Sequence, residues 1–150
     1  MNPNTEILNF AGPLKVLAET ILNRPINKAT DRLFISHLGQ GLRSEELKFM
    51  GFSYLISFLH MSCNDLGLND DTLVQFNKRL YINTMNFCEK NPNWGYANFW
   101  TDFLMQKIKE EYHDKNIIID DLRFVHEYEV LRENGFKLYK IVCPEEVRIA

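Results

Sequence analysis

The sequence predicts a single α/β domain that is rich in helix and carries a small, mostly parallel β-sheet. Its 150 residues, 45% of them hydrophobic, suffice for one ordinary globular core. Stretches with the apolar spacing of a helix outnumber the strand candidates by about six to about three. The last third of the chain has the order strand, short helix, Gly, strand, which is typical of a right-handed βαβ unit.

The chain begins with a predicted strand and a predicted amphipathic helix. Thr5 to Phe10 is a short apolar run that ends at Ala11-Gly12-Pro13. Pro13 suits the first helical position, because an N–H there would have no partner within the helix. The apolar spacing that follows is helical until Arg24-Pro25. The stripe consists of Leu14, Leu17, Ala18, Ile21 and Leu22.

Two further helices are predicted before residue 63. Thr30 can cap the first, with Asp31 in its first turn, and Gly39-Gln40-Gly41 is expected to break it. Ser44 can cap the second, which is expected to run to about Ser62. Because the second half of this helix is apolar nearly all round, we expect it to be the most buried helix.

The middle of the chain is expected to be helical throughout. Asn64 to Asp71 is a turn region with acidic N-cap candidates, and a helix is predicted over Thr72 to Glu89. The next helix is predicted to start near Tyr96 and to end in the charged run of residues 107–115. Within the single domain 1–150, we assign residues 44–92 to a helical insert or lid-like region.

The last third of the chain supplies the other predicted strands. Asn116 to Asp120 is a β-branched run without polar alternation, which is typical of a strand buried on both faces. Val125 to Asn134 is predicted as a helix, with Gly135 as the residue that ends it. Lys137 to Cys143 is predicted as the following strand, and Pro144 ends it.

Composition and charge exclude several classes of protein. Seventeen basic and 20 acidic residues give a net charge of −3, which argues against a nucleic-acid-binding module. The cysteines, Cys63, Cys88 and Cys143, form no CxxC pair, which indicates buried thiols in a reducing compartment. No apolar run approaches the roughly 18 residues of a membrane span, and no secretory signal is visible. We expect a cytoplasmic protein, in the host cytoplasm if the source is a virus, with no membrane partner.

Ligand chemistry is expected beyond the carboxyl ends of the parallel strands. The first strand end is followed by Lys15, and the second by Asp121 and Arg123. An aspartate there can hold a hydrated Mg²⁺, and an arginine can bind a phosphate through two hydrogen bonds. The structural alternative is that Asp121 caps the next helix and Arg123 pairs with Glu127.

Residues 117–144 resemble the C-terminal half of the bacteriophage deoxynucleoside monophosphate kinases. That family has a strand ending in Asp-x-Arg, a helix with an early Glu, then Gly and a strand ending near Pro. Three earlier segments resemble the family in the same order: residues 9–15, residues 32–43 with Leu38-Gly39, and residues 94–108. Together they cover roughly half the chain. The family pattern is matched here by Asp121, Arg123, Glu127, Gly135 and Pro144.

The resemblance implies a truncated P-loop nucleotide kinase. The chain has no GxxxxGK motif, so it lacks the P-loop that holds the phosphates of ATP, and the family's tail beyond the last strand is also missing. The resemblance, without the P-loop, therefore implies a catalytically inactive relative that binds a nucleotide, another phosphorylated small molecule or a protein. Catalytic residues are left unassigned. The implied binding residues are Lys15, Arg32, Arg43, Asp121 and Arg123.

Two other functions remain open. The chain is an active kinase for deoxynucleoside monophosphates if another chain supplies the P-loop, and Mg²⁺ and ATP are expected only then. Alternatively it is an interaction protein, or a homodimer, with a recycled kinase fold. No metal site is expected, since His60 and Cys63 lack a third ligand. Several aromatic residues either stack a nucleobase or belong to the core: Trp94, Tyr96, Phe99 and Trp100.

The missing P-loop strand also bears on the sheet. In kinases of this type that strand lies between the strands matching Ile117 to Asp120 and Leu138 to Val142. Unpaired buried backbone groups cost about 1–3 kcal/mol each, so an empty gap is not viable. Either the two strands pair directly, which we favour, or a strand of another chain fills the gap by β-augmentation.

Overall fold

The computed structural model describes residues 4–63 and 66–140 of the chain. These residues form two strands and seven helices, so the predicted helix-rich α/β class with a small parallel sheet is confirmed. In chain order the elements are β1 (Thr5–Leu8), α1 (Gly12–Leu22), α2 (Lys28–Leu42), α3 (Glu45–Met50), α4 (Phe52–His60), α5 (Asp70–Lys90), α6 (Phe99–Glu111), β2 (Asn116–Ile119) and α7 (Val125–Glu133).

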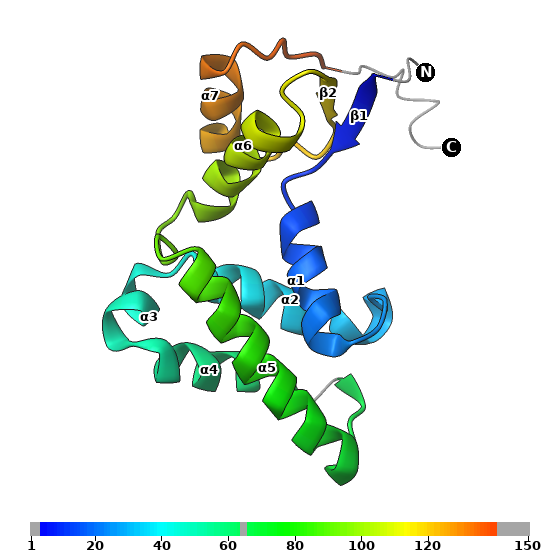
Figure 1. The fold of residues 1–150 in the computed structure, drawn as a ribbon, viewed down its shortest axis with the longest axis vertical. Coiled ribbons are helices and arrows are strands. Elements are labelled where there is room, and N and C mark those ends of the chain that lie inside the picture. Colours follow the sequence, from blue (N-terminus) through cyan, green and yellow to red (C-terminus); the bar gives the residue numbers. More distant parts are fainter. Residues whose placement is uncertain (1–3, 64–65, 141–150) are drawn as a thin grey trace, which may run out of the picture.

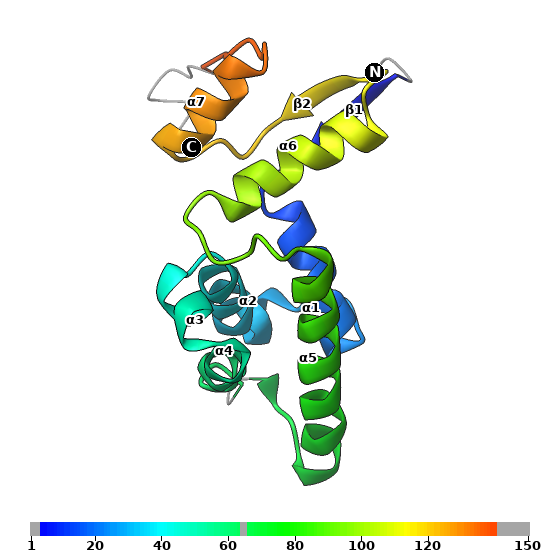
Figure 2. The ribbon, with the colours of Figure 1, turned by 60° about the vertical axis from the view of Figure 1, so that its left-hand side comes forward.

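The molecule has two regions, which Figures 1 and 2 show one above the other. We call α1 to α5 the helical body, and β1, β2, α6 and α7 the sheet end. The larger apolar cluster lies in the helical body and the smaller one in the sheet end. Helix α6 contributes to both, since Phe99 and Trp100 belong to the first cluster and Leu104 and Met105 to the second.

Local sequence signals account for most helix starts. Pro13 lies in the first turn of α1, and the Ser44 hydroxyl accepts a hydrogen bond from the N–H of Leu47 at 3.1 Å, both as predicted. The predicted cap Thr30 is wrong: Asn27 caps α2. The expected acidic cap of α5 is wrong: Asn69 is the N-cap and forms a capping box with Thr72.

Gly39-Gln40-Gly41 does not break α2, which continues to Leu42. A Cβ at Gly39 would lie 2.9 Å from Leu14 Cδ2, and one at Gly41 would lie 2.7 Å from Leu55 Cδ1. The two glycines therefore allow α1 and α4 to pack closely on α2. The close packing compensates for their low helix propensity, which is the reason that the prediction failed.

The predicted long helix after Ser44 is two helices. Gly51, with a φ of 109°, separates α3 from α4. The expectation that its second half is the most buried helix is also wrong, since in α4 only Leu55 and Leu59 are buried and Tyr54 is 53% exposed. Residues 44–92 contain α3, α4 and α5; a role as a lid remains a prediction.

β1 and β2 form a parallel two-stranded sheet, with Thr5 opposite Asn116 and Leu8 opposite Ile119. One face packs on the cluster formed with α6 and α7. On the other face Ile118 is 48% exposed, so the prediction that this strand is buried on both faces is wrong. The reason is that no described element covers this face of the sheet.

The third predicted strand is not seen in the described residues. Residues 137–140 follow α7 without strand structure, and residues 141–143 lie outside the described part. Direct pairing of this segment with β2 is therefore absent from the described sheet, which has the order β1-β2. The prediction that Gly135 ends the last helix is confirmed: α7 ends just before it, and its φ is 81°.

The two described cysteines are free thiols. Cys63 is buried and Cys88 is half-buried. Burial raises the pKa of Cys63 to about 11 and that of Cys88 to about 12. Cys143 lies outside the described residues. No helix in the described part of the chain is long and apolar enough to cross a membrane.

Candidate anion-binding cavity

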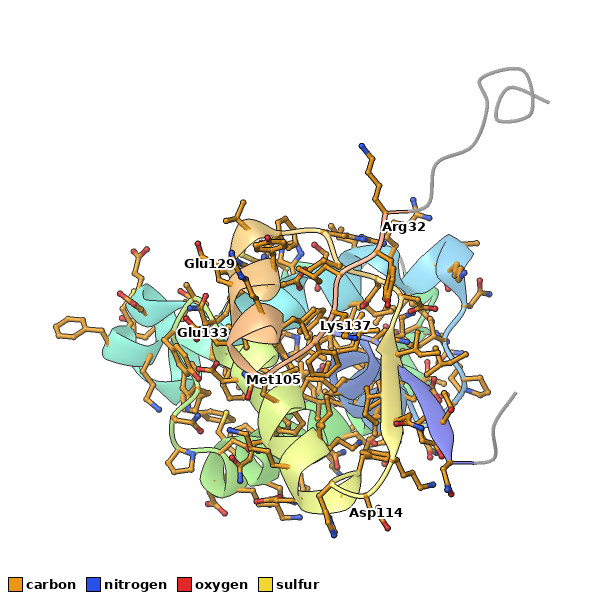
Figure 3. All side chains as sticks on the ribbon, turned by 90° about the horizontal axis from the view of Figure 1, so that it is seen from above. Arg32, Met105, Asp114, Glu129, Glu133 and Lys137 are labelled. Atoms are coloured by element: carbon orange, nitrogen blue, oxygen red, sulfur yellow. The ribbon has the colours of Figure 1, made fainter. Side chains whose placement is uncertain are left out.

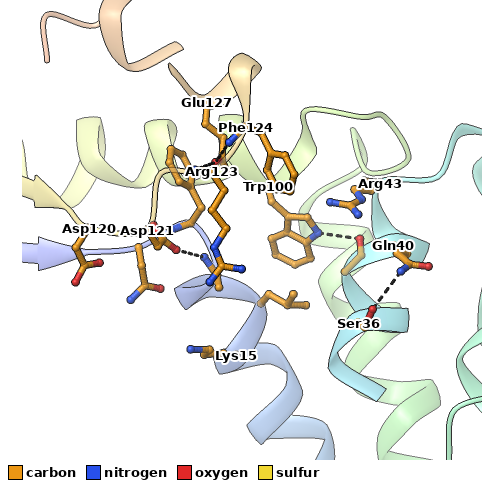
Figure 4. Close-up of a pocket in the computed structure, with 15 residues that line it drawn as sticks. Lys15, Ser36, Gln40, Arg43, Trp100, Asp120, Asp121, Arg123, Phe124 and Glu127 are labelled. Atoms are coloured by element: carbon orange, nitrogen blue, oxygen red, sulfur yellow. Dashed lines mark hydrogen bonds between the residues drawn. The ribbon is translucent and has the colours of Figure 1, made fainter. Parts of the chain in front are cut away.

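A cavity of about 580 Å³ lies where the helical body meets the sheet end. Its walls come from the turn between β1 and α1, the C-terminal half of α2, the start of α6 and the loop between β2 and α7 (Figure 4). Both predicted strand ends thus open into one cavity, as expected for parallel strands. It is lined by Asn9, Phe10, Ala11, Leu14, Lys15, Ser36, Gly39, Gln40, Arg43, Trp100, Asp120, Asp121, Arg123, Phe124 and Glu127.

Four of the five residues predicted to bind ligand line this cavity: Lys15, Arg43, Asp121 and Arg123. They come from segments far apart in the chain, from residue 15 to residue 123. Arg32 does not line it. It lies one turn of α2 before the lining residue Ser36, is exposed, and stands near the outline of the molecule in Figure 3.

The Asp121 carboxylate joins the two strand ends. Oδ1 accepts a hydrogen bond from the N–H of Phe10 at 3.0 Å, and Oδ2 accepts one from the N–H of Ala11 at 3.4 Å. The alternative that Asp121 caps α7 is therefore wrong. Its two hydrogen bonds hold the turn before α1 against the loop after β2. The described residues contain no group of three or more His, Cys, Asp or Glu placed to hold a metal ion.

Glu127 caps α7 from within its first turn. Its Oε1 accepts hydrogen bonds from the backbone N–H groups of Arg123, at 3.0 Å, and Phe124, at 3.1 Å. The alternative that Arg123 forms an ion pair with Glu127 is therefore wrong: among the described residues Glu127 contacts Arg123 only at its main chain. The Arg123 guanidinium instead extends into the cavity on the side of Lys15 (Figure 4).

The cavity holds three cations without ion pairs among the described residues: Lys15, Arg43 and Arg123. Lys15 lies in the first turn of α1, where backbone N–H groups give the helix end a partial positive charge. The carboxylates of Asp121 and Glu127 also line the cavity, but each already accepts two backbone hydrogen bonds. The lining thus carries three positive and three negative side chains, and the carboxylates other than Asp120 are already hydrogen-bonded to the main chain. An anionic ligand is therefore favoured beside Lys15 and Arg123, at the positive end of α1.

Trp100 is the aromatic wall of the cavity. Its indole Nε1 donates a hydrogen bond to the carbonyl of Gly39 at 3.1 Å, which fixes the ring between Arg123 and Arg43 (Figure 4). Phe124, 55% exposed, adds a second ring that stacks on His126 with 9° between the planes. A planar ligand group can therefore contact aromatic surface while its anionic group meets the cations.

The other aromatic residues considered for nucleobase stacking lie elsewhere. Trp94 and Phe99 belong to the core of the helical body. The Tyr96 hydroxyl donates a hydrogen bond to Asp102 Oδ2 at 2.6 Å in a separate cleft, and burial together with this bond raises the pKa of Tyr96 to about 12. Of this set, Trp100 alone lines the cavity.

Part of the cavity wall is formed by residues that no sequence motif indicated. Ser36 and Gln40 line it from α2, where Gln40 Nε2 donates to Ser36 Oγ at 3.1 Å. They lie four residues apart and precede Arg43 by seven and three residues. This spacing places all three on one helix face, so the sequence pattern could have indicated them. Asn9 gave no such signal; its buried Oδ1 has no hydrogen-bond partner among the described residues.

Searches with family models, with curated proteins and with solved structures found no match to this chain. The resemblance to the phage kinases therefore stays a prediction from sequence motifs.

Proposed function

We propose that the cavity binds a phosphorylated small molecule of the nucleoside monophosphate class, without phosphoryl transfer by the isolated chain. The observation that carries this proposal is that three cations, none of them ion-paired within residues 4–63 and 66–140, converge on one cavity that also contains an indole ring. Phosphate fits such a site because it accepts several charge-assisted hydrogen bonds at once.

The lining residues suggest how such a ligand would lie. Its phosphate would meet Lys15 and Arg123 near the first turn of α1, where the main chain also favours an anion. Its planar ring would contact Trp100, with Phe124 at the edge. Arg43 lies on the other side of the indole and would meet a second polar or anionic part of the ligand.

The absence of a GxxxxGK motif from the sequence supports binding without catalysis. Phosphoryl transfer depends almost wholly on positioning and on neutralising the charge of the donor phosphates, which is the task of the P-loop and Mg²⁺. Each 1.36 kcal/mol of lost transition-state stabilisation lowers the rate about tenfold. We therefore expect no measurable kinase activity from the chain alone.

An active kinase completed by another chain is the second candidate. In the described sheet β2 pairs with β1 along one edge, and its other edge carries no strand. A strand that adds there would extend the sheet beside the carboxyl end that precedes Asp121 and Arg123. In that case ATP and Mg²⁺ would be bound mainly by the second chain, and activity would appear only in the mixture.

The experiment is a binding screen on the pure chain. Isothermal titration and thermal shift are measured with the deoxynucleoside monophosphates, the ribonucleoside monophosphates, the matching nucleosides and inorganic phosphate. We expect at least one monophosphate to bind more tightly than its nucleoside and more tightly than phosphate alone. If no monophosphate binds better than its nucleoside, the proposal fails. Turnover of ATP with a monophosphate by the pure chain would contradict the inactive reading.

A further inference from the structure

A second hollow, distinct from the anion-binding cavity, lies between α1, α5 and α6. We call it the apolar groove; its volume is about 300 Å³. Pro13 and Leu17 are buried in its floor, Phe87 and Phe103 are half-buried, and Val16 is 63% exposed at its rim. The groove therefore presents apolar surface that the described part of this chain leaves uncovered.

Two lysines lie beside this apolar surface. Lys90 is the last residue of α5 and Lys107 lies on α6, and both line the groove. Neither forms an ion pair with any residue in the described ranges 4–63 and 66–140. A partner that combines an apolar side chain with carboxylates would therefore be complementary to the groove.

Helix α3 presents that combination. Phe49 is 92% exposed, the largest exposed fraction of any large hydrophobic residue in the described part of the chain. Glu45 and Glu46 precede it by four and three residues, so both lie on the same side of α3 as the phenyl ring. Both glutamates are exposed, and α3 has no buried residue.

Helix α3 lies apart from α1 and α5, two of the helices that line the apolar groove, in both ribbon views (Figures 1 and 2). With its ring almost fully exposed, Phe49 does not occupy the groove of its own chain. We propose that Phe49 of one copy enters the apolar groove of a second copy, where Glu45 and Glu46 face Lys90 and Lys107. A projecting apolar side chain and a complementary pocket elsewhere on the surface make such a self-contact, which closes as a dimer if it is reciprocal.

None of these residues lines the anion-binding cavity, so the proposal stands or falls independently of the proposed function. The first test is sedimentation velocity of the full chain over a wide range of concentrations. We expect a reversible monomer–dimer equilibrium. Phe49→Ser should raise the dissociation constant by about tenfold or more, the effect of withdrawing one buried phenyl ring.

The matched control is Met61→Ser, which removes an apolar side chain that is also largely exposed, at 70%, but lies outside α3 and the groove. It should leave the dissociation constant unchanged. A chain that stays monomeric at every concentration overturns the proposal. So does a dimer that Phe49→Ser weakens no more than Met61→Ser does.

A charge swap tests the docking geometry. The pair Glu45→Lys and Glu46→Lys should weaken association, and the pair Lys90→Glu and Lys107→Glu should weaken it as well. Mixing the two double variants should restore a heterodimer, because the reversed charges again face one another across one of its two contacts. Circular dichroism confirms that each variant is folded. If the mixture associates no better than either double variant alone, the assigned contact is wrong.

Discussion

The helical body and the sheet end are held together in different ways. The core of the helical body is large and includes fully buried rings such as Phe34 and Phe76, which meet edge to face at 5.7 Å. The buried apolar cluster of the sheet end has only four members in the described residues. Hydrogen bonds from the main chain to the carboxylates of Asp121 and Glu127 also hold this region together. The comparison teaches that apolar burial stabilises one region, while hydrogen bonds position the loops of the other around a cavity.

The largest effect should come from the core of the helical body. Phe34→Ala removes a ring with no exposed surface and should lower the free energy of unfolding by about 3–5 kcal/mol. Leu131→Ala, in the sheet end, should instead loosen that region alone. Hydrogen exchange measures both: Leu131→Ala should expose amides of β1, β2 and α7 while α2 and α5 stay protected. Equal loss of protection in both regions would contradict the comparison.

The next effect concerns a charged link inside the helical body. Asp31 is fully buried and accepts hydrogen bonds from Arg24 Nη1, at 2.6 Å, and Nη2, at 2.8 Å, and from the N–H of Asn27, at 2.7 Å. Asp31→Asn removes the charge that these donors face. Chemical denaturation should show a loss of about 1.5–3 kcal/mol at neutral pH, the range for hydrogen bonds to charged groups. Lys115→Gln, which breaks the exposed ion pair with Glu6, is the control and should have little effect.

The same carboxylate predicts a pH dependence. The Arg24 hydrogen bonds, followed by those of Asn27 and Thr30, outweigh burial and lower the pKa of Asp31 from 3.8 to about 2. Because the folded-state pKa lies below the unfolded one, the stabilisation is complete above pH 3.8 and is lost as the pH falls towards 2. Denaturation curves across this range should show the loss in the natural chain. In Asp31→Asn this part of the acid sensitivity should disappear.

In the cavity, one arginine can be compared with another. Arg123→Ala should weaken binding of a nucleoside monophosphate by about 1.5–3 kcal/mol, because it removes a charge-assisted hydrogen bond to the phosphate. Arg32→Ala removes the same side chain one turn outside the cavity and should leave the affinity unchanged. Isothermal titration measures both. Equal effects would mean that the phosphate binds elsewhere or responds only to overall charge.

The smallest expected effect is an increase in stability. Thr84 has no exposed surface, and its Oγ1 has no hydrogen-bond partner within the described structure. Thr84→Val keeps the shape and removes the unpaired hydroxyl, so it should raise the free energy of unfolding by about 1 kcal/mol. Thr101→Val, at another buried threonine that has no such orphan atom, should not stabilise the protein. Thermal denaturation of the two variants decides this.

Local sequence signals were enough to locate most helices and strands. Apolar spacing and the cap at Ser44 located the helices, and the run after Lys115 located β2, because a helix face, a cap or a short strand involves residues only a few positions apart. The convergence of Lys15 and Arg123 also followed, since the carboxyl ends of adjacent parallel strands open on the same side of the sheet.

Tertiary structure decided what depends on contacts between distant residues. Gly39 and Gly41 would break an isolated helix, yet close packing by Leu14 and Leu55 keeps α2 intact. Asp121 found its partners 111 and 110 residues away along the chain, at the N–H groups of Phe10 and Ala11, where no local rule could place them. Local patterns carry no information on such contacts, because the free energy of a packed or hydrogen-bonded pair depends on its neighbours in space.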